Sequence, residues 1–105
     1  MNRQITDERK VYSLLGLAAR ARKLASGEFM TEKSVKAGQA VLVITAQDAS
    51  DNTKKNFRDM CTYYDVPFLL FGTKEELGHA IGKELRASLA VNDAGFAEAI
   101  RKALD

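Results

Sequence analysis

The amino-acid sequence predicts an α/β protein: a three-layer α/β/α sandwich around a mainly parallel or mixed β-sheet. Three apolar runs rich in strand-forming residues are separated by stretches in which apolar residues recur with helical spacing. Strands that alternate with helices in this way favour a sheet covered by helices on both faces. The chain has one proline and no linker or repeat, so we expect a single domain over residues 1–105.

Two helices are expected before the first strand. The first, over residues 7–22, is predicted by apolar residues in the i, i+3, i+4, i+7 pattern, with two acids in its first turn. The second is expected over residues 27–37. Ser26 suits the N-cap of this helix, and Gly38 suits the position just after its last turn.

The three strands differ in length. The run AVLVIT, residues 40–45, is continuously apolar, which is typical of a strand buried on both faces. VPFLLFG, residues 66–72, is expected to be a second buried strand, with Pro67 at its first position. The short run SLAV, residues 88–91, is the third.

Three more helices follow the first, second and third strands in turn. Residues 51–64 repeat the apolar helical spacing. Thr73 and Glu76 have the spacing of a capping box, which predicts a helix that continues to Ile81. Asp93 is expected to cap the last helix, whose apolar residues face inward.

Composition narrows the class of protein. No apolar run reaches the ~18–20 residues needed to span a bilayer, and we expect no membrane partner. The first ten residues are polar and lack the apolar core of a signal peptide, so we expect the mature chain to begin at Met1 and to be cytoplasmic. Cys61 is the single cysteine, which excludes an intramolecular disulfide and a cysteine metal cluster.

Positive charge is concentrated near the N-terminus. The net charge is +2, but residues 1–36 hold eight Lys and Arg against four Asp and Glu, whereas residues 37–105 hold eight against ten. Such asymmetry points to an anionic partner for one face. Solvated helix faces are the alternative explanation for part of this excess.

Catalytic signals are poor. His79 is the only histidine, so no pair of histidines can bind a metal, and we expect it to be structural or exposed to solvent. Cys61 falls on the apolar stripe of its helix, which predicts a buried structural thiol. Gly78 and Gly82 fit no nucleotide-binding motif and lie four residues apart, which favours close packing of their helix.

The clearest functional signal is ARARKLASGEF, residues 19–29, which places three cations before a Ser-Gly turn. Gly27 lets another molecule approach the backbone, and the amides that follow it point out of a helix N-terminus. Lys33 and Lys36 lie further along that helix. The arrangement suits a phosphodiester backbone. A helix with solvated lysines, and a glycine required only for its positive φ, remains the alternative.

These segments resemble the L7Ae/L30e ribosomal protein superfamily along nearly the whole chain, and its small bacterial members most closely. The resemblance lies in the combination of three stretches, since each alone is weak. They are ARKLASG, then KSVKAGQAVLVITAQDASDNTKKN, then VPFLLFGTKEELGHAIGKELRASLAV.

The resemblance implies an α/β/α sandwich with a mixed, mainly four-stranded sheet and no catalytic activity, and we expect no cofactor and no metal. It also implies binding of structured RNA, typically kink-turns, in ribosomes and other ribonucleoprotein particles. In the family the contact surface combines the glycine-opened helix with the loop before the last strand, and the segment Asp48–Ser50 lies beside them. Here this surface maps to Gly27, Glu28, Phe29, Met30, Lys33, Leu85, Arg86 and Ala87.

The sequence departs from the family pattern two and three residues after Gly27. The strongest kink-turn binders carry Asn-Glu there and read guanine edges, whereas this chain carries Phe29 and Met30. Phe29 can stack on an unpaired base. A protein contact and a place in the core are the alternatives for this side chain.

We therefore expect a non-enzymatic, cytoplasmic RNA-binding protein that recognises kink-turn-like RNA in a ribosomal or translation-related context. The alternative is a protein-interaction module that docks on a translation factor or ribosomal protein. A weaker third hypothesis is an enzyme that uses Cys61. The expected RNA-binding residues are Arg22, Lys23, Ser26, Gly27, Glu28, Phe29, Met30, Lys33, Lys36, Leu85, Arg86 and Ala87.

Overall fold

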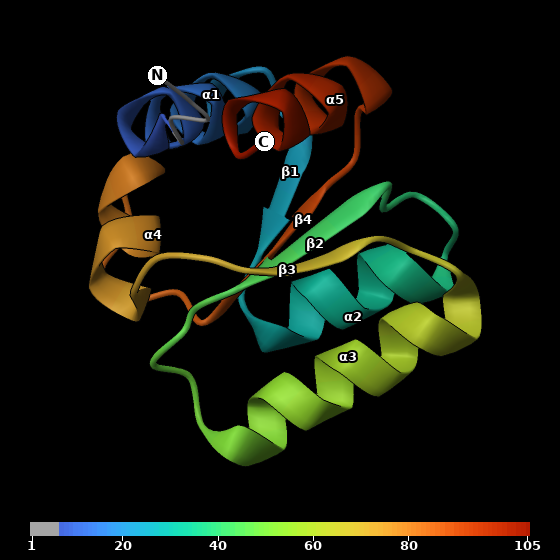
Figure 1. Ribbon diagram of the computed structural model, residues 1–105. Helices are drawn as coiled ribbons and strands as arrows, with labels where there is room; N and C mark the ends of the chain where they lie inside the picture. Colours follow the sequence, from blue (N-terminus) through green and yellow to red (C-terminus); the bar gives the residue numbers. More distant parts are fainter. Residues whose placement is uncertain (1–6) are drawn as a thin grey trace.

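The computed structural model describes residues 7–105. The expected start of the mature chain, at Met1, lies outside the described residues. Within them, five helices and a four-stranded mixed sheet form the predicted α/β/α sandwich (Figure 1).

The sheet has the strand order β1-β4-β2-β3. Its strands are β1 (Leu24–Ser26), β2 (Leu42–Thr45), β3 (Phe68–Leu70) and β4 (Ser88–Val91). β3 is parallel to β2, whereas β4 runs antiparallel to both of its neighbours. Ala90 in the centre is paired with Ala25 of β1 and with Val43 of β2. This arrangement leaves β1 and β3 at the two edges.

The four strands implied by the resemblance are confirmed, but the residue pattern alone differs from the structure at two strands. It does not predict β1, because a run of only three residues carries no clear strand pattern and forms a strand here by pairing with β4. β3 is an edge strand and not a doubly buried one, and Leu70 is 38% exposed. The chain enters β3 just after Pro67, so the missing N–H of proline breaks no hydrogen bond within the strand.

All five predicted helices are present. They are α1 (Glu8–Arg20), α2 (Glu28–Lys36), α3 (Asp51–Tyr64), α4 (Lys74–Ala80) and α5 (Ala94–Ala103). The capping box of Thr73 and Glu76 and the cap at Asp93 are confirmed. α1 ends earlier than predicted, because the chain turns into β1 through Arg22, whose φ is 61°. Gly38 follows the last turn of α2 with a φ of 77°, as predicted.

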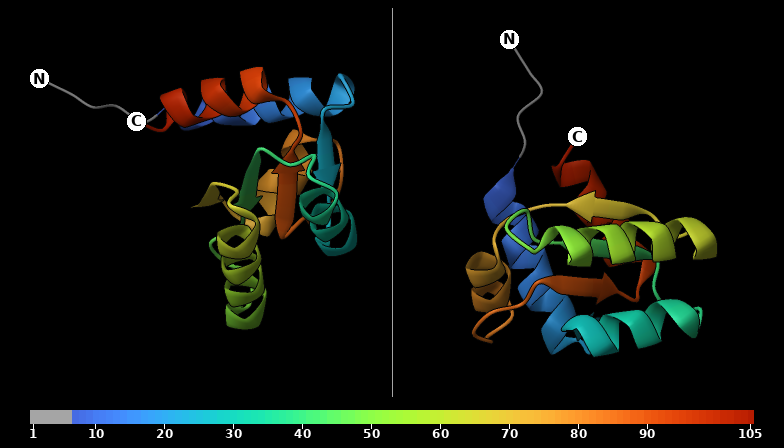
Figure 2. Two further views of the ribbon diagram at one scale, coloured as in Figure 1. Left: turned by 90° about the vertical axis from the view of Figure 1, so that its right-hand side faces the viewer. Right: turned by 90° about the horizontal axis from the view of Figure 1, so that it is seen from below.

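The helices cover both faces of the sheet. Figures 1 and 2 show α1, α4 and α5 on one face and α2 and α3 on the other. Alternate residues of β2 supply the two halves of the core: Leu42 and Ile44 pack in the cluster of α1, α4 and α5, and Val43 packs in that of α2 and α3. The buried polar side chains lie near α2 and the strand ends that it contacts.

Candidate nucleic-acid interface

Three loops meet at one end of the sheet (lower left in Figure 1): the loops that follow β1 and β2, and the loop that precedes β4. The first joins β1 to α2 at Gly27, whose N–H donates to the Ser88 carbonyl at 2.9 Å. The second leaves β2 at Ala46, whose N–H donates to the Ala87 carbonyl at 2.8 Å. The start of β4 therefore holds two segments together that are distant in sequence.

Gly27 has an unusual backbone conformation, with φ 91° and ψ 160°. This region of φ/ψ space is essentially restricted to glycine. A Cβ built at Gly27 would have no atom of the described protein within 4 Å. The φ of this position thus requires glycine, as the explanation from backbone conformation states. The space in front of it is also open, which the approach of another molecule to the backbone needs.

The N-terminus of α2 has no side-chain cap. Gly27 is its N-cap residue, and the first helical hydrogen bond runs from the Thr31 N–H to the Gly27 carbonyl at 2.9 Å. The predicted N-cap, Ser26, is wrong by one residue, because it belongs to β1. The amides of residues 28–30 precede that first hydrogen bond and carry the positive end of the helix dipole.

Arg86 connects the loop before β4 to the turn at Ser26 and Gly27. Its Nε–H donates to the Ser26 hydroxyl at 3.2 Å, and its backbone N–H donates to the Lys74 carbonyl at 3.0 Å. Next to it, Leu85 is 58% exposed. The structure therefore brings Leu85, Arg86 and Ala87 beside Ser26 and forms a second wall of the site.

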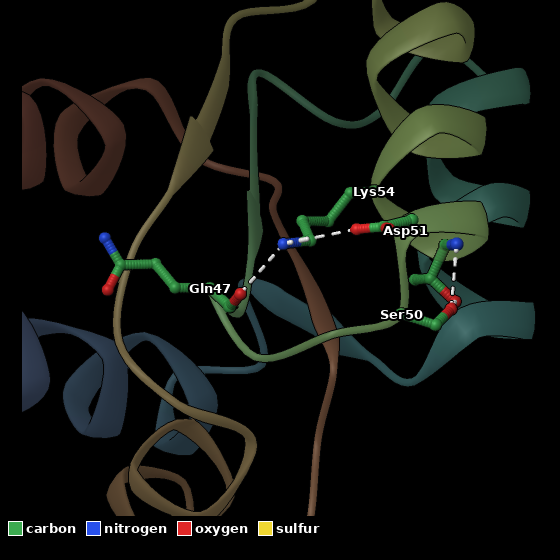
Figure 3. Close-up of polar contacts among 5 residues, drawn as sticks. Gln47, Ser50, Asp51 and Lys54 are labelled. Carbon is green, nitrogen blue, oxygen red and sulfur yellow. Dashed lines mark hydrogen bonds and ion pairs between the residues drawn. The ribbon is translucent and has the colours of Figure 1, made fainter.

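The N-terminus of α3 lies close by and is held by its own side chains (Figure 3). The Ser50 hydroxyl accepts a hydrogen bond from the Thr53 N–H at 3.0 Å. Lys54 Nζ donates to the Gln47 carbonyl at 3.0 Å and lies 3.9 Å from the Asp51 carboxylate. These contacts close the loop between β2 and α3.

Two carboxylates connect the neighbouring loops. The Thr53 hydroxyl donates to Glu28 Oε2 at 3.0 Å, which joins the starts of α3 and α2. The Lys74 N–H donates to Asp48 Oδ1 at 2.8 Å, which joins the loop after β2 to the start of α4. Sequence reasoning missed Thr53 and Lys74, because no local pattern marks a bond between separate elements.

Phe29 and Met30 point to different sides of α2. Phe29 is 75% exposed and lines a groove between α2 and α3 with Glu28 and Met60. Met30 is 46% exposed and lines a hollow beside β1 with Lys33. Their exposure excludes a place in the core, one of the alternatives for Phe29.

The two lysines of α2 differ in their surroundings. Lys36 Nζ donates to Glu32 Oε2 at 2.6 Å, and this hydrogen bond raises the pKa of Lys36. Lys33 is exposed, and no carboxylate of the described residues lies within 4 Å of its ammonium group. Lys33 is therefore the more available cation for a ligand on this helix.

Arg22 and Lys23 lie away from the loops around Gly27. Both precede β1, and the Lys23 carbonyl accepts a hydrogen bond from the Asn92 N–H, beyond the far end of β4. Three strand residues at ~3.3 Å each separate this point from Gly27. The structure does not bring these two cations together with the turn.

Three buried hydroxyl groups lie under the turn, and sequence reasoning missed them. The Ser88 carbonyl accepts from the Thr31 hydroxyl at 3.2 Å as well as from Gly27, and the Ser88 hydroxyl lies 3.1 Å from the Thr45 hydroxyl. All three side chains are fully buried. They fix the start of α2 to β4 and β2.

The described residues offer little for catalysis. Cys61 is buried, as predicted, and burial raises the pKa of its thiol to about 11. His79 is exposed, also as predicted. A Cβ at Gly78 would overlap the Glu84 carbonyl, so this glycine allows close packing, whereas Gly82 simply follows α4 with a φ of 75°.

Neither a metal centre nor a membrane span is visible in residues 7–105. No group of three or more His, Cys, Asp or Glu in this range could hold a metal ion. The helices in the same range are too short or too polar to cross a bilayer.

Comparison with known proteins places the chain in a family. Residues 9–101 match the ribosomal protein L7Ae/L30e/S12e/Gadd45 family. A protein of Bacillus subtilis strain 168 named RNA-binding protein YlxQ is 46% identical over 94 residues, which cover 90% of this chain and 94% of that protein. A protein of the same name from Enterococcus faecium is 36% identical over 99 residues, covering 94% of this chain and 95% of that protein.

Two solved structures are similar to this chain in fold. A Bacillus halodurans protein described as having unknown function has a TM-score of 0.86 and 46% identity, covering 90% of this chain and 95% of that chain. The Giardia lamblia 15.5kD RNA binding protein has a TM-score of 0.77 and 22% identity, covering 91% and 82%, and shows the same fold. The chain belongs to the ribosomal protein L7Ae/L30e/S12e/Gadd45 family.

Proposed function

We propose that this protein is a non-enzymatic, cytoplasmic RNA-binding protein, with residues 1–105 forming one RNA-binding domain. Its expected ligand is structured, kink-turn-like RNA in a ribosomal or translation-related context, with the ribosome or translation factors as further partners. The observation that carries the proposal is the open, uncapped N-terminus of α2 behind Gly27. The RNA-binding names of the YlxQ relatives support it.

The chemistry of the site suits RNA. Backbone amides at a helix N-terminus and the exposed ammonium group of Lys33 favour phosphate oxygens. Phe29 offers an exposed ring on which an unpaired base can stack. The loop of Leu85 and Arg86 forms the opposite wall, held to β1 through Ser26.

The side chains at 29 and 30 change the expected mode of recognition. A phenyl ring and a thioether cannot form the paired hydrogen bonds with guanine edges that the Asn-Glu pair of strong kink-turn binders forms. We infer that Phe29 contributes stacking, so specificity depends more on the shape of the RNA and on its unpaired bases.

Lys33 provides the first test. In Lys33→Ala, affinity for a kink-turn hairpin RNA should fall severalfold, and the slope of log affinity against log salt should fall by about 0.9. Lys102→Ala, which removes an exposed charge of α5 that lies 3.8 Å from the Glu98 carboxylate, is the control for loss of one positive charge and should bind normally. If Lys33→Ala binds like the control at all salt concentrations, the site is elsewhere.

A second candidate function follows from the exposure of Phe29. An apolar side chain that is 75% exposed beside a groove of about 520 Å³ also suits a protein partner. Pull-down from lysate with and without ribonuclease distinguishes the two functions. A partner that survives digestion and is lost with Phe29→Ser would favour the protein-interaction module.

A further inference from the structure

The outer edge of β1 has no partner strand among the described residues. Gly27 and Lys23 form hydrogen bonds with β4 and its extension, and Ala25 is paired with Ala90 between them. Because hydrogen-bonded and non-hydrogen-bonded pairs alternate in an antiparallel ladder, the peptide groups of Leu24 and Ser26 point to the free edge. This edge begins directly beside the turn at Gly27.

A hollow lies on each side of this edge. The first, of about 620 Å³, lies between α1, β1 and the end of α4, and its charged or titratable lining residues are Arg20, His79 and Lys83. The second, of about 530 Å³, lies between β1 and α2, and its charged residue is Lys33. Leu24 and Ser26 line both hollows, so β1 forms a ridge between them.

No carboxylate lines either of these hollows, whereas carboxylates line other hollows of the described surface. The groove between α2 and α3 contains Glu28 and Glu32, and the hollow beside Tyr12 contains Glu75 and Glu76. Within residues 7–105, Arg20, Lys33 and Lys83 have no carboxylate within 4 Å. Among the described residues, the Lys and Arg side chains that line the two hollows along β1 therefore form no ion pair, and no carboxylate lies beside them in these hollows.

We infer that the outer edge of β1 and the hollow of Arg20 and Lys83 bind the phosphate backbone of the RNA beyond its contact at Gly27. The inference rests on the proposed function and names the path of the RNA: from Lys33, across Ser26 and Leu24, to Arg20 and Lys83. Positively charged side chains on both sides of the ridge are complementary to a polyanion. Free peptide N–H groups on the ridge are additional donors for phosphate oxygens.

An acidic peptide fits this surface less well. A peptide that adds a strand depends on a row of main-chain hydrogen bonds, and three-residue β1 offers outward peptide groups only at Leu24 and Ser26. A phosphate backbone needs no such row, because each phosphate can contact one side chain independently. The observations therefore favour RNA as the occupant.

The test compares two double variants of the full chain. Arg20→Gln/Lys83→Gln removes the two cations of the hollow, and Arg9→Gln/Lys10→Gln removes the same charges from the exposed start of α1. The probes are a kink-turn hairpin RNA with two long stems and versions with either stem cut to a few base pairs. Affinity is measured over a range of salt concentrations, and melting temperature shows that each variant is folded.

With the long-stemmed RNA, we expect Arg20→Gln/Lys83→Gln to bind about tenfold more weakly, with a salt slope lower by about 1.8, while the control binds normally. Shortening one particular stem should remove the difference between this variant and the wild type. If the variant binds like the control while Lys33→Ala is impaired, the inference is wrong and the proposed function stands. If the wild type binds none of these RNAs, both are wrong.

Discussion

The N-termini of α2 and α3 lie next to each other and are joined by the hydrogen bond from Thr53 to Glu28, but they are completed differently. At α3, the Ser50 hydroxyl accepts the Thr53 N–H at 3.0 Å, and the preceding loop is held by Lys54. At α2, Gly27 has no side chain that could accept hydrogen bonds from the amides that follow it. Of the five helices in residues 7–105, α2 is the one without a side-chain cap.

A side-chain cap and an open N-terminus have different consequences, the first for the stability of the fold and the second for binding. A capped N-terminus satisfies its amides internally and stabilises the fold by about 1 kcal/mol. An uncapped one leaves its donors to solvent or to a ligand, and a glycine there keeps the approach open. The proposed function therefore gives α3 a structural role and makes α2 the helix that contacts RNA.

The largest expected effect is at Gly27. Gly27→Ala and Gly27→Leu should both lose about 1–3 kcal/mol of stability, because any Cβ is strained at a φ of 91°. RNA affinity should fall further with the larger side chain, on the order of tenfold for Ala and a hundredfold for Leu. This range corresponds to the loss of one hydrogen bond to a charged group, about 1.5–3 kcal/mol. Thermal melts and gel-shift titrations measure the two quantities.

Gly38 is the matched control for Gly27. It lies at the other end of α2, has a φ of 77°, and also has open space where a Cβ would lie. Gly38→Ala should lose about 1 kcal/mol of stability and keep its RNA affinity. Affinity that follows stability across all three variants would show that Gly27 matters only for its backbone conformation.

A smaller effect is expected at the cap of α3. Ser50→Ala should lower the free energy of unfolding by about 1 kcal/mol and the melting temperature by about 4–8 °C. RNA affinity at a temperature where the variant is folded should stay within about twofold, and Ser50→Asp should restore stability as a cap. A larger loss of RNA affinity in Ser50→Ala, measured at a temperature where the variant is fully folded, would place α3 in the binding surface as well.

How far the fold can be predicted depends on whether a feature is local. The caps at Thr73 and Asp93 were predictable because each is made within a few residues. β1 was not, because its strand conformation comes from pairing with β4, which is more than 60 residues away in sequence. The missed strand also explains the misplaced N-cap, since Ser26 belongs to β1. The edge position of β3 depends on strand order, which no local pattern contains.

The same distinction applies to the site. Gly27 and Lys33 were predicted as site residues from the turn and the helix around them, and the family resemblance placed the loop of Arg86 beside them. The distance of Lys23 from the turn could not be predicted without β1. The buried hydroxyls of Thr31 and Ser88 resemble ordinary core positions, and their roles depend on tertiary contacts.

The most direct test of RNA contact at the start of α2 is amide hydrogen exchange, measured residue by residue with and without a kink-turn hairpin RNA. We expect the amides of residues 28–30 to exchange rapidly in the free protein and to become protected in the complex. The Thr53 amide, bonded to Ser50, should be protected in both states. If RNA binds and the amides of residues 28–30 remain unprotected, the N-terminus of α2 is not the contact, and the role assigned to it is wrong.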